Sequence, residues 1–174
     1  KDIHGGSIRI FVSEVGNYKI KRSVKKICDM ESKAMLNSKK ILIKFQKKVI
    51  QNRLKLVSLL TNLKKMNKKI VVLSAPAKGM TLLNYCKLDN DYIDYATEKS
   101  KLKQGLYTPG GNIPVYSDNK ILKTKPDYAL LLAWNFSKEI IKNNMQYLKK
   151  GGKFIIPIPD IKIITKGKNE KNKN

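Results

Sequence analysis

Residues 69–88 read KIVVLSAPAKGMTLLNYCKL, and this stretch decides the predicted fold. Ile70–Leu73 is an uninterrupted apolar run rich in β-branched residues, which is typical of a strand buried in a parallel sheet. Mostly small residues follow at 75–79, and the apolar positions of 81–86 then recur at helical intervals. A strand, a small-residue turn and a helix N-terminus together leave backbone N–H groups that can bind an anion.

The turn at 75–79 predicts a phosphate site without predicting a particular cofactor. Lys78 would add a mobile positive charge to the backbone N–H groups. The segment lacks both the GxGxxG pattern of dinucleotide-binding loops and the GxxxxGK[ST] pattern of phosphate-hydrolysing loops. An ordinary strand-to-helix connection carrying a solvated lysine is the alternative interpretation.

The charge of the chain is extreme. It has 37 basic and 13 acidic residues, a net charge of +24, which by itself suggests nucleic acid or an anionic membrane as a partner. However, Arg9, Arg22 and Arg53 are the only arginines, whereas base-reading surfaces favour the planar guanidinium group. The lysines are also spread along the whole chain. A solvated lysine-rich surface is therefore the expectation, and nucleic-acid binding is the less favoured alternative.

The cysteine content and hydropathy of the chain predict its redox state and whether it crosses a membrane. Cys28 and Cys86 stand far apart and His4 is the only histidine, so we expect reduced thiols in a cytoplasmic protein and no metal site. No stretch approaches the roughly 18 apolar residues of a membrane span, and the N-terminus lacks a signal-peptide profile. The chain begins with Lys1, and we expect it to be the remainder of a longer polypeptide.

The N-terminal third is predicted to hold one strand and two helices. Residues 7–12 alternate polar and apolar side chains, which indicates a strand. Residues 23–34 form a helix in this prediction, and residues 38–66 form a longer helix whose apolar stripe packs on another element. In the first helix the residues expected to face inward are Val24, Ile27, Cys28 and Met30.

The remaining chain alternates between strand and helix patterns. Further strands are predicted at 92–96, 128–134 and 154–158, with a helix at 138–149. This order predicts an α/β fold, a doubly wound and mostly parallel Rossmann-like sheet preceded by a long helical segment. We expect one domain over residues 1–165 and a disordered lysine- and asparagine-rich tail over 166–174.

Three loops follow predicted strands, at 75–81, 97–114 and 134–137. The carboxyl ends of parallel strands meet at one edge of a sheet, where doubly wound folds bind their ligands. These loops should therefore gather around one site.

Five segments, taken in order, resemble one known family. They are HGGSIRIFV at 4–12, SAPAKGMTLLNY at 74–85, KQGLYTPGGNIPV at 103–115, PDYALLLAWNFSKEI at 126–140 and GGKFIIPIP at 151–159. Together they resemble the C-terminal domain of S-adenosylmethionine-dependent sugar-nucleotide C-methyltransferases, over nearly the whole chain up to Pro159. Such enzymes methylate a carbon of a nucleotide-linked deoxysugar.

The resemblance implies an acceptor-binding role and a set of site residues. One group would bind the phosphates of a nucleotide-diphosphate sugar from the turn: Ala77, Lys78, Gly79 and Thr81. A second phosphate group would come from the neighbouring loop: Lys103, Gln104 and Gly105. Tyr107, Trp134 and Asn135 would line the base or sugar, with core or loop packing as the alternative for Tyr107 and Trp134.

The departures from the family pattern limit what the chain is expected to do. Met80 stands where the family usually has asparagine, and Asn112 stands where it often has histidine. The family's Gly-rich donor-binding segment and its Tyr-x-Glu-His catalytic motif are absent from these residues, and His4 does not match that histidine.

We therefore expect S-adenosylmethionine to be bound by an upstream methyl-donor domain or subunit and not by this chain, and no catalytic residue is assigned. A freestanding, non-catalytic nucleotide-sugar-binding module is the alternative.

Overall fold

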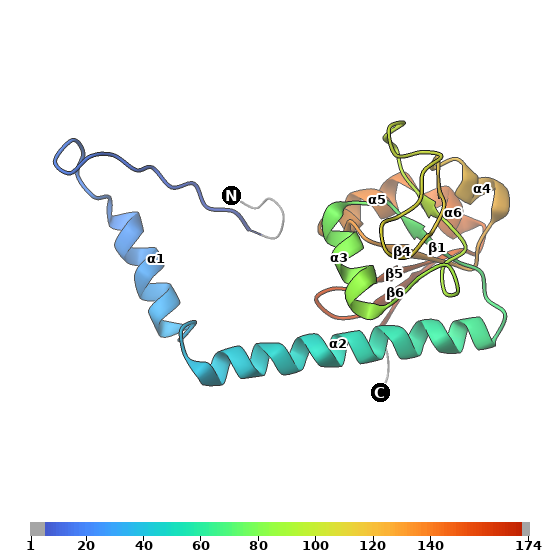
Figure 1. The fold of residues 1–174 in the computed structure, drawn as a ribbon, viewed down its shortest axis with the longest axis horizontal. Coiled ribbons are helices and arrows are strands. Elements are labelled where there is room, and N and C mark those ends of the chain that lie inside the picture. The colour runs from blue at the N-terminus through green and yellow to red at the C-terminus, as the bar shows by residue number, and fades with distance from the viewer. Residues whose placement is uncertain (1–5, 172–174) are drawn as a thin grey trace. The chain divides into compact units, whose positions relative to one another are not determined.

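The computed structural model describes residues 6–171 of the 174-residue chain. The chain divides into two compact units, Lys1–Ile50 and Gln51–Asn174, where its length predicts a single domain. Helix α2 (Lys39–Lys65) runs through the boundary between the two units (Figure 1). His4 and Gly5 of the HGGS segment lie outside the described residues.

The first unit does not contain the strand predicted at 7–12. These residues have no regular secondary structure, and the sheet of the protein is built entirely from later residues. Ile8, Phe11 and Val12 are 66%, 83% and 90% exposed. The alternating pattern suits a pleated surface, but an extended segment becomes a strand only when its backbone groups find a ladder partner.

The two predicted helices of this region are confirmed, but the predicted packing of the first helix is wrong, and that of the second is confirmed only over its second half. Helix α1 spans Arg22–Lys33 and has no buried residue, so the expected inward face of Val24, Ile27, Cys28 and Met30 is exposed. Helix α2 begins as predicted, because the Ser38 hydroxyl accepts a hydrogen bond from the Ile41 N–H at 3.2 Å. The apolar side chains of α2 become buried only in the second unit.

A seven-stranded sheet forms the centre of the second unit, in the order β3-β2-β1-β4-β5-β6-β7. The strands are β1 (Ile70–Leu73), β2 (Ala96–Thr97), β3 (Val115–Tyr116), β4 (Tyr128–Leu131), β5 (Lys153–Ile156), β6 (Lys162–Thr165) and β7 (Lys168–Lys171). The first five are parallel, which confirms the predicted α/β class. Because β2 and β3 lie on one side of β1 and β4 lies on the other, the winding reverses between β1 and β4.

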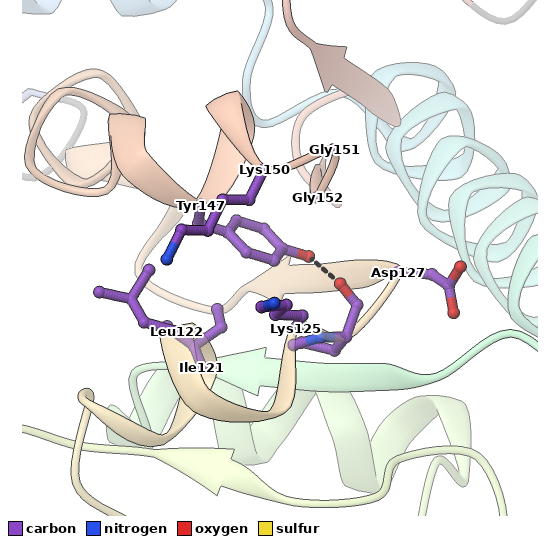
Figure 2. Close-up of a pocket in the computed structure, with 9 residues that line it drawn as sticks. Ile121, Leu122, Lys125, Asp127, Tyr147, Lys150, Gly151 and Gly152 are labelled. Atoms are coloured by element: carbon purple, nitrogen blue, oxygen red, sulfur yellow. Dashed lines mark hydrogen bonds between the residues drawn. The ribbon is translucent and has the colours of Figure 1, made fainter.

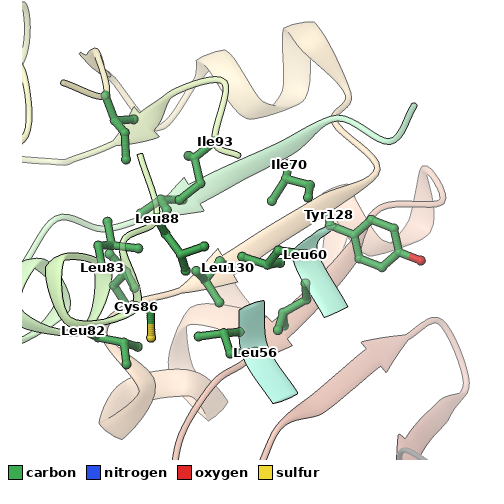
Figure 3. Packing of buried hydrophobic residues seen from close by; sticks show 14 of the residues in the cluster. Leu56, Leu60, Ile70, Leu82, Leu83, Cys86, Leu88, Ile93, Tyr128 and Leu130 are labelled. Atoms are coloured by element: carbon green, nitrogen blue, oxygen red, sulfur yellow. The ribbon is translucent and has the colours of Figure 1, made fainter. Parts of the chain in front are cut away.

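Helices cover both faces of this sheet. The second half of α2 packs on one face together with α3 (Ala77–Cys86), and the buried cluster there includes Leu56, Leu60 and Leu130 (Figure 3). The other face is covered by α4 (Lys120–Thr124), α5 (Ser137–Asn143) and α6 (Met145–Lys149). Successive residues of β4 alternate between the two clusters, as expected for a strand buried on both sides.

Several elements differ in extent from the sequence prediction. The strand predicted at 92–96 forms ladder pairs only at Ala96 and Thr97, and both β3 and α4 were missed. The helix predicted at 138–149 is interrupted at Asn144, whose side-chain amide donates to the Ile140 carbonyl at 2.8 Å. A side chain that bonds to a nearby backbone group competes with the regular helix pattern.

The C-terminal residues extend the sheet. Strands β6 and β7 form an antiparallel hairpin on β5, so the backbone of 168–171 is paired where composition predicts a disordered tail. A ladder joins backbone groups and does not require apolar side chains. The expectation for 172–174 falls outside the described residues. Within the described part of the chain, no helix combines the length and apolar character needed to cross a membrane.

Candidate functional site

Three loops meet at the carboxyl ends of β1, β2 and β4, as the parallel order predicts. The loop after β1 is joined to the loop after β2 by a hydrogen bond from the Ala75 N–H to the Glu98 carboxylate, 3.1 Å long. It is joined to the loop after β4 by Lys78, whose ammonium lies over the Trp134 ring. The candidate site is therefore formed by residues far apart in sequence.

The turn after β1 is shaped by a close approach between α3 and the residue that follows β4. A Cβ on Gly79 would lie 2.6 Å from the Leu132 Cβ, so only glycine fits at this position. The Gly79 N–H already donates to the Pro76 carbonyl at 2.9 Å. Gly79, a predicted phosphate ligand, thus sets the spacing of α3 in the structure, and its N–H is engaged within the turn.

Lys78 and Trp134 are the predicted site residues that the structure brings together. The Lys78 Nζ lies 4.8 Å from the centroid of the Trp134 ring and 5.9 Å from that of Phe136. Such contacts stabilise a cation on an aromatic face by about 0.5–1 kcal/mol at exposed sites. Trp134 also packs against the core cluster, so packing and ligand contact are compatible roles for it. This pair lies at the β1–β4 reversal point of the sheet.

The other predicted residues of this group lie nearby on the surface. Ala77 is the first residue of α3 and is exposed, and the Thr81 hydroxyl donates to the Ala77 carbonyl at 3.3 Å. Asn135 is exposed within the short 3-10 helix η1 (Trp134–Phe136).

The second predicted phosphate group uses its donors inside the protein. The Lys103 ammonium donates to the Ala75 carbonyl at 3.0 Å and lies 3.5 Å from the Glu98 carboxylate. The Gln104 side-chain amide donates to the Glu98 carbonyl at 2.8 Å, and the Gly105 N–H donates to the Val115 carbonyl at 2.9 Å. Lys103 thus ties the loop to the turn after β1, Gly105 ties it to β3, and Gln104 closes the loop on itself.

Glu98 is the site residue that sequence reasoning missed. Its side chain is only 15% exposed and accepts hydrogen bonds from the N–H groups of Ala75, Lys99 and Ser100. Burial raises the pKa of Glu98, but these N–H groups and the Lys103 ammonium outweigh burial and hold the pKa below its ordinary value. The available signal was an acidic residue directly after a strand, followed by polar loop residues.

Tyr107 is not placed with the Lys78–Trp134 pair. It is 67% exposed and forms an isolated bridge with Pro114, and none of the contacts found within residues 6–171 joins it to Lys78 or Trp134. Met80, which departs from the family pattern, packs against the core cluster.

A cavity of about 140 Å³ lies at the opposite edge of the sheet, beside the amino ends of β4 and β5 (Figure 2). The buried Tyr147 hydroxyl donates to the carbonyls of Pro126 and Lys153 at 3.0 and 3.3 Å. Gly152 leaves room for the Tyr147 ring, because a Cβ there would overlap it. Since open α/β sheets bind ligands at the carboxyl ends of their strands, we interpret this cavity as a packing feature.

Comparisons with known proteins agree with the resemblance seen in the motifs. Residues 2–159 match the model of the C-methyltransferase C-terminal domain. The chain is 32% identical over 165 residues to the C-methyltransferase NovU of Streptomyces niveus, an alignment that covers 94% of this chain and 39% of that protein. The chain thus spans about two-fifths of the length of this relative. It belongs to the C-methyltransferase C-terminal domain family.

Proposed function

We propose that this chain is the acceptor-binding domain of an S-adenosylmethionine-dependent C-methyltransferase and that it holds a nucleotide-diphosphate sugar at the carboxyl edge of its sheet. One observation carries the proposal. The Lys78 ammonium and the Trp134 ring lie together at the β1–β4 reversal point, where doubly wound sheets bind nucleotides. Membership in the C-methyltransferase family supports it.

The arrangement suits a ligand with both a negative and a planar part. The first turn of α3 carries the Lys78 side chain and presents the positive end of the helix dipole. A phosphate group offers Lys78 a charge-assisted hydrogen bond in place of its contact with the Trp134 ring. Once Lys78 has moved, the ring face becomes available to a base or sugar, and stacking of a base on an aromatic side chain contributes about 1–3 kcal/mol.

The residues of this site do not fit the methyl donor itself. In doubly wound folds an acidic residue after the second strand commonly accepts the hydroxyl groups of an adenosine ribose. Glu98 occupies that place here, but its carboxylate oxygens are engaged by three backbone N–H groups and by Lys103. We therefore place S-adenosylmethionine on another domain or subunit of the methyltransferase, which would be the partner of this chain.

A separate acceptor-binding domain has a physical use in such an enzyme. Binding energy from the nucleotide, remote from the reacting carbon, can hold the sugar in a reactive orientation. Orientation of two reactants can account for several kcal/mol of a reaction barrier. We therefore propose that this chain contributes to the reaction by holding the sugar in the reactive orientation.

The proposal is tested by titrating the full chain with thymidine diphosphate glucose and then with S-adenosylmethionine at moderate salt. Trp134 is the only tryptophan, so intrinsic fluorescence reports on the site, and calorimetry measures affinity independently. We expect the sugar nucleotide to bind and S-adenosylmethionine not to bind. Lys78→Met should weaken sugar-nucleotide binding about tenfold, the loss expected for one charge-assisted contact.

Lys149→Met is the matched control, because Lys149 is an exposed lysine at the end of α6, near the amino ends of the strands. It removes the same charge and should leave affinity unchanged. Absence of sugar-nucleotide binding, or equal losses in the two variants, would overturn the proposal.

A further inference from the structure

The Glu98 carboxylate occupies the N–H of Ala75 in the turn before α3. One oxygen, Oε2, accepts the Ala75 N–H at 3.1 Å and lies 3.5 Å from the Lys103 Nζ. The other, Oε1, accepts the N–H groups of Lys99 and Ser100 at 2.9 and 3.2 Å. A carboxylate offers about four acceptor positions, so this group has a partner for each of them.

Lys103 is held from two sides. Its ammonium meets the Glu98 carboxylate and also donates to the Ala75 carbonyl at 3.0 Å. Ala75 thus gives its N–H to Glu98 and its carbonyl to Lys103, which closes a ring of contacts between the β1–α3 turn and the loop after β2. An external phosphate would have to displace Glu98 to use the Ala75 N–H, and at Lys103 it would meet an ammonium whose charge Glu98 already offsets.

Lys78, unlike Lys103, contacts aromatic rings instead of a carboxylate. Its ammonium lies over the rings of Trp134 and Phe136, and no acidic side chain among the described residues lies within ion-pair distance of it. A contact with an aromatic face is weaker than a pair with a phosphate, so this lysine can exchange one for the other. The two lysines of the predicted phosphate site therefore differ in whether a carboxylate pairs with them among the described residues.

Building on the proposed function, we propose that Glu98 is a specificity-determining residue, an internal anion that closes the β1–α3 turn and Lys103 to the ligand's phosphates and directs them to Lys78. The phosphates then bind on the β4 side of the turn, next to Trp134. Lys103 and Gln104 shape the loop and do not contact the ligand. The negative charge of Glu98 also repels a phosphate from the β2 side of the turn.

The first test uses inorganic phosphate and does not depend on any nucleotide. The backbone amide resonance of Ala75 is followed by NMR during a phosphate titration of the full chain, for the wild type and for Glu98→Gln. Glutamine has nearly the same shape but no charge, so the turn opens to an anion. We expect a saturable shift of the Ala75 resonance in Glu98→Gln and none in the wild type.

Glu139→Gln, an exposed residue of α5, is the matched control and should behave as the wild type does. A saturable Ala75 shift in the wild type would show that Glu98 does not close the turn. Absence of a shift in a folded Glu98→Gln chain would show that the turn is not an anion position. Either result overturns the inference.

The second test measures binding of thymidine diphosphate glucose by calorimetry in single and double variants. Lys103→Met should change the dissociation constant less than about twofold in the wild-type background, while Lys78→Met should raise it about tenfold. Glu98→Gln should bind several-fold more tightly than the wild type, and the double variant Glu98→Gln/Lys103→Met should lose that gain.

Each opposite result has a separate meaning. Equal losses in Lys103→Met and Lys78→Met would make Lys103 a direct ligand and overturn the inference while leaving the proposed function intact. Weaker binding in Glu98→Gln would show that Glu98 supports the site instead of restricting it. If the wild type does not bind the sugar nucleotide at all, the proposed function fails, and the phosphate titration still decides the role of Glu98.

Discussion

The two units of the chain carry similar apolar patterns and bury them to very different extents. Phe11 and Val12 of the first unit are 83% and 90% exposed, whereas Ile93 and Ile113 of the second unit are fully buried. Local periodicity correctly predicted both helices of the first unit and several elements of the second. Whether an apolar face is covered depends on what packs against it, and periodicity does not contain that information.

Helix α2 contains this contrast within a single element. Leu42 in its first turn is 56% exposed, and Leu60 near its other end is fully buried among residues of β1, β4 and α3 (Figure 3). Both leucines lie on a helix of regular amphipathic spacing. Many large apolar side chains along 8–50 are exposed.

The largest expected difference between the units is in thiol reactivity. Cys28 on α1 is exposed, while Cys86 on α3 is 2% exposed, and burial raises the pKa of its thiol despite the opposing effect of Arg53. Iodoacetamide should label Cys28 at least about a thousandfold faster, because Cys86 reacts only when the second unit opens. Mass spectrometry of timed samples measures both rates. Similar rates in the native protein would contradict the burial contrast, and similar rates in urea are the control.

A second prediction compares two leucines of the same helix. Leu60→Ala removes a fully buried side chain and should lower the free energy of unfolding by about 2–5 kcal/mol. Leu42→Ala removes an exposed one and should change it by less than about 0.5 kcal/mol. Urea denaturation followed through Trp134 fluorescence measures both, since Trp134 belongs to the second unit. A comparable loss in Leu42→Ala would show that the first half of α2 is packed in solution.

The smallest expected effect concerns two carboxylates. Asp127 accepts the Lys69 N–H at 2.9 Å and pairs with Lys68 at 3.2 Å. Burial raises the pKa of Asp127, but Lys69 and Lys68 outweigh it and the net shift is downward. Its stabilisation is therefore present above the ordinary aspartate pKa of about 3.9 and is lost as pH falls through the lower folded-state value.

Asp127→Asn should cost about 0.2–1 kcal/mol at pH 7, the range of exposed ion pairs, and the difference from the wild type should shrink in acid. Asp29→Asn on α1 is the control, because the Lys25–Asp29 pair is highly exposed and should contribute little. The free energies of unfolding of the wild type and both variants are measured in urea at pH 7 and in acid. A cost for Asp127→Asn that stays constant with pH would mean that its charge is not the cause.

Much of the fold followed from local patterns. The apolar runs that became β1 and β4 were recognisable because strands buried on both faces lack polar interruptions. Strand β2 was overestimated, since only Ala96 and Thr97 find ladder partners, and β6 and β7 were missed because a hairpin at the sheet edge has a weak apolar signal. The strand expected at 7–12 does not form, because its backbone has no strand to pair with among the described residues.

The candidate site was predicted in part. The turn with Lys78 and the loop with Trp134 could be identified because each follows a strong strand pattern. The sequence could not predict that Glu98 pairs with Lys103 or that Leu132 lies close to Gly79. Both contacts depend on the distance between loops after folding. A lysine in a sequence has the same charge whether or not a carboxylate has already paired with it.

By itself, the sequence determined the α/β class, the order of the principal helices and strands, and the family, because these depend on side-chain periodicity and on motifs within short segments. Tertiary structure alone decided which apolar faces are buried, which of the two lysines of the predicted phosphate site is paired with an acid, and which glycine is required for close packing. Those properties arise from contacts between residues distant in sequence. They exist only once β1, β2 and β4 lie side by side.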